Sequence, residues 1–492
     1  MGHEVAIFAY YGLNGSLLNW QGIPIYPNPG GDYGVKWAEE VYKHFQADCL
    51  ITLVDIWVLG QMSPNLKWFS WVPIDHEPMP PGVYKVLSTH PGLYKPIAMS
   101  KFGEREMKRL GIDCFYVPHM IDCNVFHPDL ELRKTQREAV GWTDKFIIGK
   151  VGTNVRERKD WTAAFLALQK FRKYHDDVVM YCHTDIGETR GRDLERLRQN
   201  LMIQDITFFP PRTELLLTGV SDITMNNMYN SLDIYLSNSK GEGFGIPTIE
   251  AQACGVPVIV SNNTAQPELC GGGWILKRMK PEFDEQSSWE GAADPEEIVE
   301  CLEEAYQEKK SGKLAERKVA ARDKALEYDI GTVMEKYWKP TLAVIEKMIK
   351  LPQGMRPFTS TGGDYRNVFI PKDCEPKRVI DIGCGIKQAW KARLAHLGEY
   401  TGIDIKPGDG IIQMDAHNLK FPYKHFGFAW CCDVLEHVDD PEKVVKEAQR
   451  VAEHGVILFC TPNAQEFKID PEHKVVNLRH ALTKAGHGVF TW

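Results

Sequence analysis

The chain lacks the features that mark membrane, secreted and zinc-binding proteins. It contains no run approaching the ~18 consecutive apolar residues of a transmembrane helix, and no signal-peptide pattern at its start. Its 12 cysteines are scattered without a CxxC pair or zinc-ligand spacing, and they are expected to be reduced thiols. These absences predict a cytoplasmic protein without membrane spans or disulfides, and they leave peripheral membrane contact open.

An excess of positive charge is also absent. The net charge is -8, so the chain offers no overall electrostatic footprint for nucleic acid, and a local basic patch stays open. Its apolar content of 43% and charged content of 25% are those of an ordinary globular protein. The 492 residues suffice for about three domains of ~150 residues, each able to bury its own core.

The stretch from Ser237 to Leu269 carries the most information. It reads as a loop, a helix that starts at Pro247 and stops at Gly255, and a buried strand from Pro257 to Ser261. Proline suits the first positions of a helix, and glycine supplies the left-handed cap just past its end. The pattern therefore predicts a short helix that follows directly on a loop.

That loop combines glycines with carboxylates. Gly241, Gly243 and Gly245 let backbone N–H groups approach a ligand, and the helix start adds partial positive charge, so an anion pocket is expected. Glu242 and Glu250 lie at its rim, where they would repel a phosphate and so would bind hydroxyl groups. A site that binds a phosphate through N–H groups and hydroxyls through carboxylates favours a nucleotide-sugar as its ligand. The alternative is a surface loop whose glycines serve turns only.

The run EGFGIPTIEAQACGVPVIVS resembles the E-x7-E signature of retaining glycosyltransferases of family 4, which have the two-domain GT-B fold. The resemblance implies that Glu242 faces the donor sugar and that Glu250 holds the ribose. It also places Gly243, Phe244 and Gly245 at the donor. The expected fold class is therefore α/β, with a GT-B pair of Rossmann-like domains.

The acceptor-side domain of this pair is expected over residues 1–140. The opening run MGHEVAIFAYYG reads as a strand, and in GT-B proteins such sequence begins the second strand. We therefore expect the first βα unit to be missing, either because the chain is a fragment or has a late start, or as a genuine short form. The loss of a central strand would make this domain the weakest.

Two apolar runs of strand length follow, from Ala47 to Ile56 and from Leu66 to Ile74. The second places Asp75, His76 and Glu77 at its carboxyl end, where ligands bind in open α/β sheets. Relatives carry a histidine or aspartate here, facing the donor sugar and the acceptor. Asp75 and His76 are therefore catalytic candidates, with the alternative that the histidine is structural.

The order strand (Lys95 to Met99), Ser-Lys, helix and PHMIDCNVFHP resembles the end of the family's N-terminal domain. It sets a hinge near Asp129 to Asp144, and makes His119 and His127 loop-shaping residues. The nucleotide-sugar domain is expected over residues 144–350, where strands alternate with helices as in a parallel sheet. Its last helix, WKPTLAVIEKMIK, resembles the one that crosses back onto the N-terminal domain.

Two adjacent cations in the second domain lie just before a predicted helix. Asp160 is its expected N-cap, so Arg158 and Lys159 lie at the helix start, where they would neutralise a diphosphate leaving group. Family members keep a lysine at this place and an arginine near the end of the preceding strand. In this chain Arg156 or Arg158 must supply the charge of that arginine. Lys240 is a second phosphate candidate. The alternative is a solvated charge run.

Residues 351–376 are rich in Gly, Pro and charge and are read as a linker. Beyond it, over residues 377–492, the strand and helix pattern restarts. Its candidate nucleoside-binding residues end successive strands: Asp381, Gly383, Gly385, Asp404 and Asp415. With DVLEHV at the fourth strand, the order resembles class I S-adenosylmethionine-dependent methyltransferases.

Two departures bear on this methyltransferase-like domain. Lys387 stands where many relatives carry a third glycine, and the chain ends at GHGVFTW, before the usual last hairpin strand. An unpaired sheet edge would be left there. We therefore expect a truncated domain whose activity the sequence does not decide.

The expected function is retaining transfer of a sugar from a nucleoside-diphosphate sugar to a hydroxyl acceptor. The acceptor would be a glycan, a lipid-linked sugar or a surface polysaccharide, and S-adenosylmethionine would serve the appended module. No Asp-x-Asp occurs, so no metal is expected, and Arg158, Lys159 and the helix start would hold the diphosphate. The alternatives are a methyltransferase whose GT-B part only binds a glycan, and a non-catalytic remnant.

Overall fold

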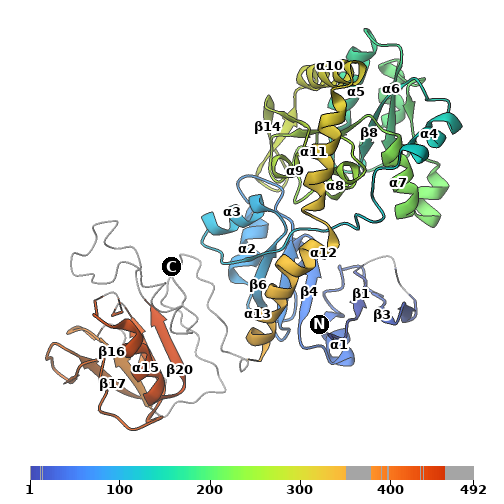
Figure 1. Ribbon diagram of the computed structural model, residues 1–492. Helices are drawn as coiled ribbons and strands as arrows, with labels where there is room; N and C mark the ends of the chain where they lie inside the picture. The colour runs from blue at the N-terminus through green and yellow to red at the C-terminus, as the bar shows by residue number, and fades with distance from the viewer. Residues whose placement is uncertain are drawn as a thin grey trace. The chain divides into compact units, whose positions relative to one another are not determined.

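The computed structural model describes residues 2–10, 13, 15–350, 378–388, 391–395, 398–432, 434–435 and 437–459. The chain divides into two compact units, Met1–Ile349 and Lys350–Trp492 (Figure 1). The predicted linker, residues 351–376, and the predicted truncated end of the chain both lie outside the described residues.

The first domain of the first unit is built on a four-stranded parallel sheet in the order β4-β5-β6-β7. All of β5 is buried, as expected for an inner strand of a parallel sheet. The strands are β4 (Leu50–Leu53), β5 (Trp68–Val72), β6 (Leu93–Ala98) and β7 (Phe115–Tyr116). The helices are α1 (Ala38–Phe45), α2 (Pro81–Thr89), α3 (Lys101–Arg109) and the 3-10 helix η1 (Ile56–Leu59).

The opening residues form less strand than predicted. The strand β1 (Ile7–Phe8) is two residues long and pairs with β3 (Ile23–Tyr26), which also pairs with β2 (Leu18–Trp20). These three strands form a sheet of their own, separate from β4 to β7. Ile7 and Trp20 are exposed, so this sheet buries little apolar surface.

The predicted hinge holds a helix, α4 (Leu130–Ala139), capped by the Asp129 side chain, which accepts from the backbone N–H of Leu132 at 2.9 Å. Arg133 and Arg137 of this helix each place Nη2 2.5 Å from a carboxylate oxygen of the buried Asp233. Because Asp233 lies next to a strand of the second sheet, these ion pairs fix α4 to the second domain.

The second domain is a six-stranded parallel sheet in the order β10-β9-β8-β11-β12-β13. Figure 1 shows α11 beside α8 and α10 beside α5. The strands are β8 (Phe146–Val151), β9 (Val178–His183), β10 (Thr207–Phe208), β11 (Ile234–Ser237), β12 (Val258–Ser261) and β13 (Trp274–Leu276). The helices are α5 (Trp161–Arg172), α6 (Leu194–Asn200), α7 (Asp222–Ser231), α8 (Ile246–Ala253), α9 (Gln266–Leu269), α10 (Pro295–Ser311), α11 (Leu314–Leu326) and the π-helical turn η2 (Glu214–Thr218).

An antiparallel hairpin follows β13. Its strands are β14 (Met279–Phe283) and β15 (Trp289–Ala293), with Phe283 directly opposite Trp289. The two rings pack edge to face with centroids 5.1 Å apart, and both remain exposed. The hairpin therefore projects from the sheet instead of extending it.

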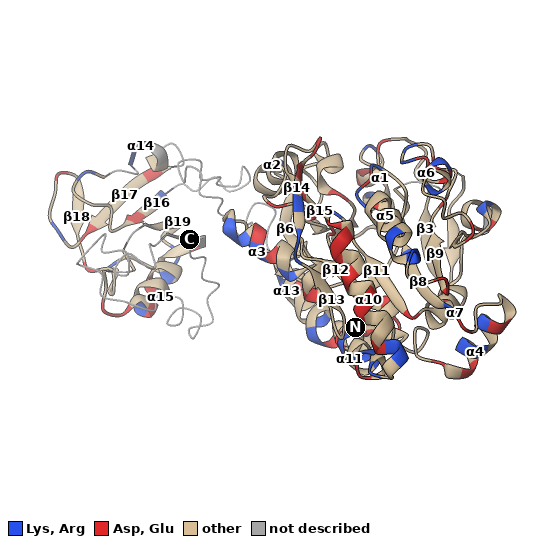
Figure 2. Cartoon of the chain, turned by 90° about the horizontal axis from the view of Figure 1, so that it is seen from above, with Lys and Arg blue, Asp and Glu red and all other residues tan. Residues whose placement is uncertain are grey.

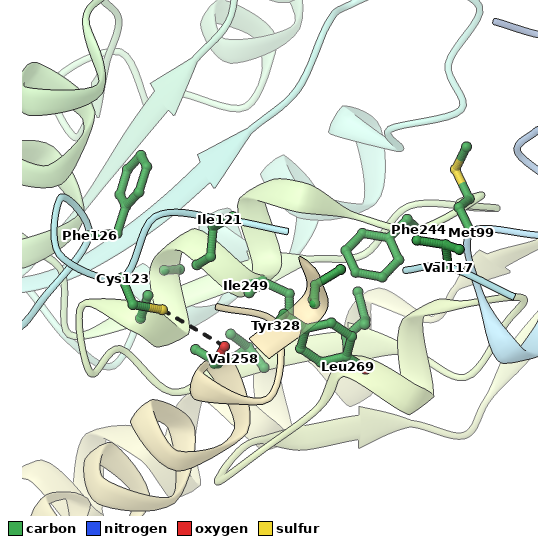
Figure 3. Packing of buried hydrophobic residues seen from close by; sticks show 14 of the residues in the cluster. Met99, Val117, Ile121, Cys123, Phe126, Phe244, Ile249, Val258, Leu269 and Tyr328 are labelled. Atoms are coloured by element: carbon green, nitrogen blue, oxygen red, sulfur yellow. Dashed lines mark hydrogen bonds between the residues drawn. The ribbon is translucent and has the colours of Figure 1, made fainter. Parts of the chain in front are cut away.

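The unit ends in α12 (Ile330–Val333), the π-helical turn η3 (Met334–Trp338) and α13 (Lys339–Ile349). Trp338 and Ile345 share a buried cluster with Phe69 and Trp71 of β5, and the rings of Trp71 and Trp338 lie 5.0 Å apart. The last helix thus packs on the first sheet. Figure 3 shows another part of the same cluster, where Phe244 lies near Tyr328 and α8.

The second unit contains a five-stranded parallel sheet in the order β18-β17-β16-β19-β20. The strands are β16 (Arg378–Ile382), β17 (Glu399–Asp404), β18 (Ile411–Gln413), β19 (Phe426–Cys432) and β20 (Ala452–Phe459). The helices are α14 (Lys391–Leu394) and α15 (Pro441–Val451). Successive strands are added on one side of β16 up to β18, and on its other side from β19 onward. In open α/β sheets, ligands bind beside such a point, at the carboxyl ends of the strands.

Acidic and basic residues are distributed along both units (Figure 2). A run of glutamates lies along α10, and lysines follow in its last turn. This arrangement complements the helix dipole. Among the described residues, no helix is both long enough and apolar enough to cross a membrane.

Candidate functional site

The stretch from Ser237 to Leu269 folds as the sequence predicts, with element boundaries that differ by about one residue. Helix α8 starts at Ile246, so Pro247 lies in its first turn, and Gly245 precedes it with a φ of 118°. It ends at Ala253, and Gly255 follows with a φ of 73°. Glycine is needed at both flanking positions because other residues rarely adopt positive φ. The helix start therefore points toward the loop of Gly241 to Gly245.

Two glycines of that loop serve close packing between the domains. A Cβ on Gly241 would lie 2.1 Å from the Asp75 carbonyl oxygen, and one on Gly243 would lie 2.3 Å from Pro73 Cβ. The sequence predicted ligand approach for these glycines, with turns as the alternative. The backbone after β5 instead supplies the neighbours that exclude a side chain, and it brings Asp75 and His76 against the motif.

The carboxylate of Glu242 is buried between two cations. Its Oε2 lies 2.9 Å from Arg158 Nη1, and its Oε1 is bound by Lys159 Nζ. Arg158 Nη1 also donates to the Gly241 carbonyl at 2.6 Å. Burial alone would raise the pKa of Glu242, but Lys159 and Arg158 hold it well below its usual range. The two cations formally exceed the Glu242 carboxylate by one charge, and the nearby carboxylate of Asp75 also acts on both of them.

The segment before α5 positions these cations. Arg156, Glu157 and Asp160 all have positive φ although none is glycine, a conformation that costs energy. The Asp160 side chain caps α5, as predicted, by accepting from the Ala163 N–H at 3.1 Å. The sequence left open whether Arg156 or Arg158 supplies the second charge. Arg158 is the one that reaches Glu242.

Lys240, the other predicted phosphate contact, is turned toward the hairpin. Its Nζ is bound to Glu282 of β14, and its carbonyl accepts from the Gly291 N–H of β15 at 3.0 Å. Its own N–H donates to the Arg158 carbonyl at 2.8 Å. Lys240 therefore connects the glycine loop to Arg158 and to the β14–β15 hairpin. Its ammonium group is paired with Glu282.

His76 is fully buried among carboxylates. Nδ1 lies 2.7 Å from Asp75 Oδ1, while Nε2 lies 3.1 Å from Asp284 Oδ2 and 3.5 Å from Glu290 Oε1. Burial would lower the pKa of His76, but the hydrogen bond to Asp75 and the surrounding charges raise it to about 9. Sequence reasoning missed Asp284 and Glu290. The only signal was the acidic run FDEQSSWE after β13.

Glu250 lies on α8, eight residues after Glu242, as the signature requires. Its Oε2 accepts from the Tyr229 hydroxyl at 2.8 Å, and burial raises its pKa to about 7. Phe244, also predicted at the donor, has a buried ring. The ring lies 5.3 Å from that of His119 and 5.5 Å from that of Tyr328.

The second unit has a separate candidate site at the carboxyl ends of β16 and β17. Asp404 Oδ2 accepts from the Gly385 N–H at 2.9 Å, which closes the loop after β16. A Cβ on Gly385 would meet nothing within 4 Å, so space is open there. Asp381 is buried, accepts from the Tyr400 hydroxyl at 2.7 Å, and has its pKa raised to about 7 by burial.

Two other predicted residues of this unit have different surroundings. A Cβ on Gly383, whose φ is 71°, would lie 2.2 Å from Val434 Cγ2, so packing as well as backbone conformation requires glycine. Asp415 is largely exposed and binds His417 through Nδ1 at 2.7 Å. Asp381, Gly385 and Asp404 are therefore the more enclosed part of this candidate site.

Comparison with known proteins finds a likeness in each unit. Residues 133–274 match the model of the family described as glycosyl transferases group 1, and residues 360–490 match that of a methyltransferase domain. One stretch of the chain is thus similar to glycosyltransferases and another to methyltransferases. The O-antigen chain mannosyltransferase B of Escherichia coli is 42% identical over 57 residues, which are 12% of this chain and 15% of that protein.

Two further likenesses cover more of each unit. Norajmaline N-methyltransferase of Rauvolfia serpentina is 28% identical over 142 residues, 23% of this chain and 47% of that protein. Sucrose-phosphate synthase from Thermosynechococcus elongatus superposes with a TM-score of 0.54 at 14% identity, over 70% of this chain and 90% of that one. The glycosyltransferase unit has the GT-B fold. The chain spans at most about half the length of these two curated relatives.

Proposed function

We propose that the glycosyltransferase unit moves a sugar from a nucleoside-diphosphate donor to a hydroxyl group of a glycan acceptor, with retention of anomeric configuration. The observation that carries the proposal is the buried group of Arg158, Lys159 and Glu242 beside the start of α8. Its two cations would meet a diphosphate beside the backbone N–H groups of that helix start. The retaining outcome rests on the E-x7-E resemblance.

The mechanism follows from an exchange of partners. Without donor, Glu242 occupies both cations. An arriving diphosphate would take Arg158 and Lys159 and leave the Glu242 carboxylate free to accept from sugar hydroxyls. As the sugar–phosphate bond breaks, charge grows on the leaving phosphate, and fixed cations in a buried site stabilise it. A leaving phosphate oxygen would then take the acceptor proton on the same face of the sugar.

The remaining roles are assigned by position. Glu250, eight residues along from Glu242, would accept the ribose hydroxyls in place of the Tyr229 hydroxyl. The short likeness to a mannosyltransferase makes nucleoside-diphosphate mannose the first donor to screen. The O-antigen role printed for that relative supports a surface glycan as the acceptor class. Such donors are used in the cytoplasm, which is where we place the reaction.

The decisive experiment compares Lys159→Ala with Lys170→Ala. Lys170 lies on α5 and makes a surface ion pair with Glu296, so it is a matched control. Loss of a cation that acts on developing charge costs about 100-fold or more in kcat. Lys159→Ala should therefore lower kcat by this factor and donor affinity by much less. An unchanged rate would remove Lys159 from the site.

We propose that the second unit binds S-adenosylmethionine, with Asp404 accepting from the ribose hydroxyls and Asp381 and Gly385 beside the nucleoside. The open space at Gly385 and the Asp404 contact to its N–H support the fit. The bound cofactor would supply the methyl group. In the rival assignment the GT-B part only binds a glycan, and any sugar transfer in the preparation would then be the same for the wild type and Glu250→Ala.

A further inference from the structure

Three side chains with metal-binding atoms converge between the loop after β5 and the β14–β15 hairpin. His76 Nε2, Asp284 Oδ2 and Glu290 Oε1 all lie within 4.8 Å of one another. Nε2 is 3.1 Å from Asp284 Oδ2 and 3.5 Å from Glu290 Oε1. Ligands of one zinc ion, each ~2.0–2.2 Å from the metal, are themselves about 3 to 3.5 Å apart. The two distances to Nε2 therefore fit ligands of a single small cation, and the two carboxylate oxygens lie within 4.8 Å of each other.

Two of the three ligands are held in place by further hydrogen bonds. Asp75 Oδ1 lies 2.7 Å from His76 Nδ1, which fixes the ring with Nε2 facing the two carboxylates. Asp284 Oδ1 accepts from the backbone N–H groups of Gln286 at 2.9 Å and Ser288 at 3.4 Å, which leaves Oδ2 for Nε2. Outer contacts of this kind orient ligands in metal centres.

The arrangement favours a cation at Nε2. If Nδ1–H donates to Asp75, Nε2 directs its lone pair at the carboxyl groups of Asp284 and Glu290, which is repulsive where these are ionised. A proton on Nε2 adds one positive charge to a group with three carboxylates. A divalent cation adds two and bonds to all three ligand atoms.

We propose that His76, Asp284 and Glu290 bind one divalent transition-metal ion such as Zn²⁺. A nitrogen with two carboxylate oxygens suits such ions, whereas Mg²⁺ and Ca²⁺ prefer oxygen ligands alone. The ion would tie the first domain to the hairpin of the second. It would not clamp the diphosphate, so the absence of Asp-x-Asp does not bear on it. The proposal does not depend on sugar transfer.

The test measures Zn²⁺ binding to the full chain without an affinity tag, after chelation and dialysis. Titration calorimetry compares the wild type with the double variant Asp284→Asn, Glu290→Gln. Glu303→Gln is the control, because His175 Nε2 and Glu303 Oε2 form a pair 2.6 Å apart with a single carboxylate. We expect one site in the wild type and in Glu303→Gln, and at least tenfold weaker binding in the double variant.

Co²⁺ provides the second readout, because free cysteines also bind Zn²⁺. Nitrogen and oxygen ligation should give visible cobalt bands without the intense sulfur-to-cobalt charge transfer of thiolate sites. Zn²⁺ should also raise the Tm of the wild type and not that of the double variant. A double variant with normal circular dichroism that keeps the site would overturn the proposal. So would a wild type in which only a proton occupies Nε2 at saturating Zn²⁺.

Discussion

Glu250→Gln should remove the part of the pH dependence of the free energy of unfolding that comes from the Glu250 carboxyl group. Burial raises the pKa of this carboxyl from 4.5 to about 7 in the folded chain. Between these values the folded chain holds a proton that the unfolded chain has released. The free energy of unfolding therefore falls as the pH rises through this window, by up to about 3 kcal/mol. Glutamine has the same shape, can accept from Tyr229, and does not titrate.

The assay is urea unfolding of the wild type and Glu250→Gln at pH 5, 6, 7 and 8. Other titrating groups are common to both proteins and cancel in the difference. We expect the variant to gain on the wild type progressively from pH 5 to pH 8. The same substitution at the exposed Glu285 is the control and should give a flat difference.

A second substitution tests the cause of the shift. The Tyr229 hydroxyl hydrogen bond lowers the Glu250 pKa and opposes the effect of burial. Tyr229→Phe should therefore move the pH dependence to higher pH instead of abolishing it. A difference between wild type and Glu250→Gln that stays constant from pH 5 to pH 8 would refute the reasoning, because Glu250 would then ionise as an exposed carboxyl does.

Three other expectations follow from the packing and the two units. Gly243→Ala should cost about 1 to 3 kcal/mol of stability, measured by denaturant unfolding, because its Cβ would lie 2.3 Å from Pro73 Cβ; an unchanged midpoint would contradict the packing described. Asp233→Asn should cost about 3 to 5 kcal/mol, since the buried Arg137 and the half-buried Arg133 lose an ionised partner, and a loss below 1 kcal/mol would refute this. Asp404→Ala should abolish S-adenosylmethionine binding in calorimetry while sugar transfer persists, and joint loss of both would show that the units are coupled.

The parts of the fold that the sequence predicted depend on local patterns. The cap at Asp160 and the helix between Gly245 and Gly255 follow from residue types that few other conformations accept. The parallel sheets follow from buried apolar runs separated by helices. Family resemblance placed Lys159 at the diphosphate and Glu242 at the donor sugar, and the structure adds an ion pair between the two side chains.

The parts that it did not predict depend on contacts between distant segments. No spacing relates His76 to Asp284, which lie 208 residues apart in sequence and 3.1 Å apart in the structure. The hinge was placed on a polar run, yet Arg133 and Asp233 fold that run into a helix bound to the second domain. Lys240 was read as free for phosphate because Glu282, its partner, belongs to a hairpin that no pattern marked.

The ion pairs of Glu242 also determine which anions could compete for the pocket. A carboxylate held on the same chain as its cations acts as a tethered competitor, with an effective concentration of about millimolar or more. Free phosphate or a lone nucleoside monophosphate must displace it with few compensating contacts. A nucleoside-diphosphate sugar can replace both cation contacts and offer hydroxyls to the released carboxylate. Glu242 would then weaken the binding of fragments of the donor more than the binding of the whole donor.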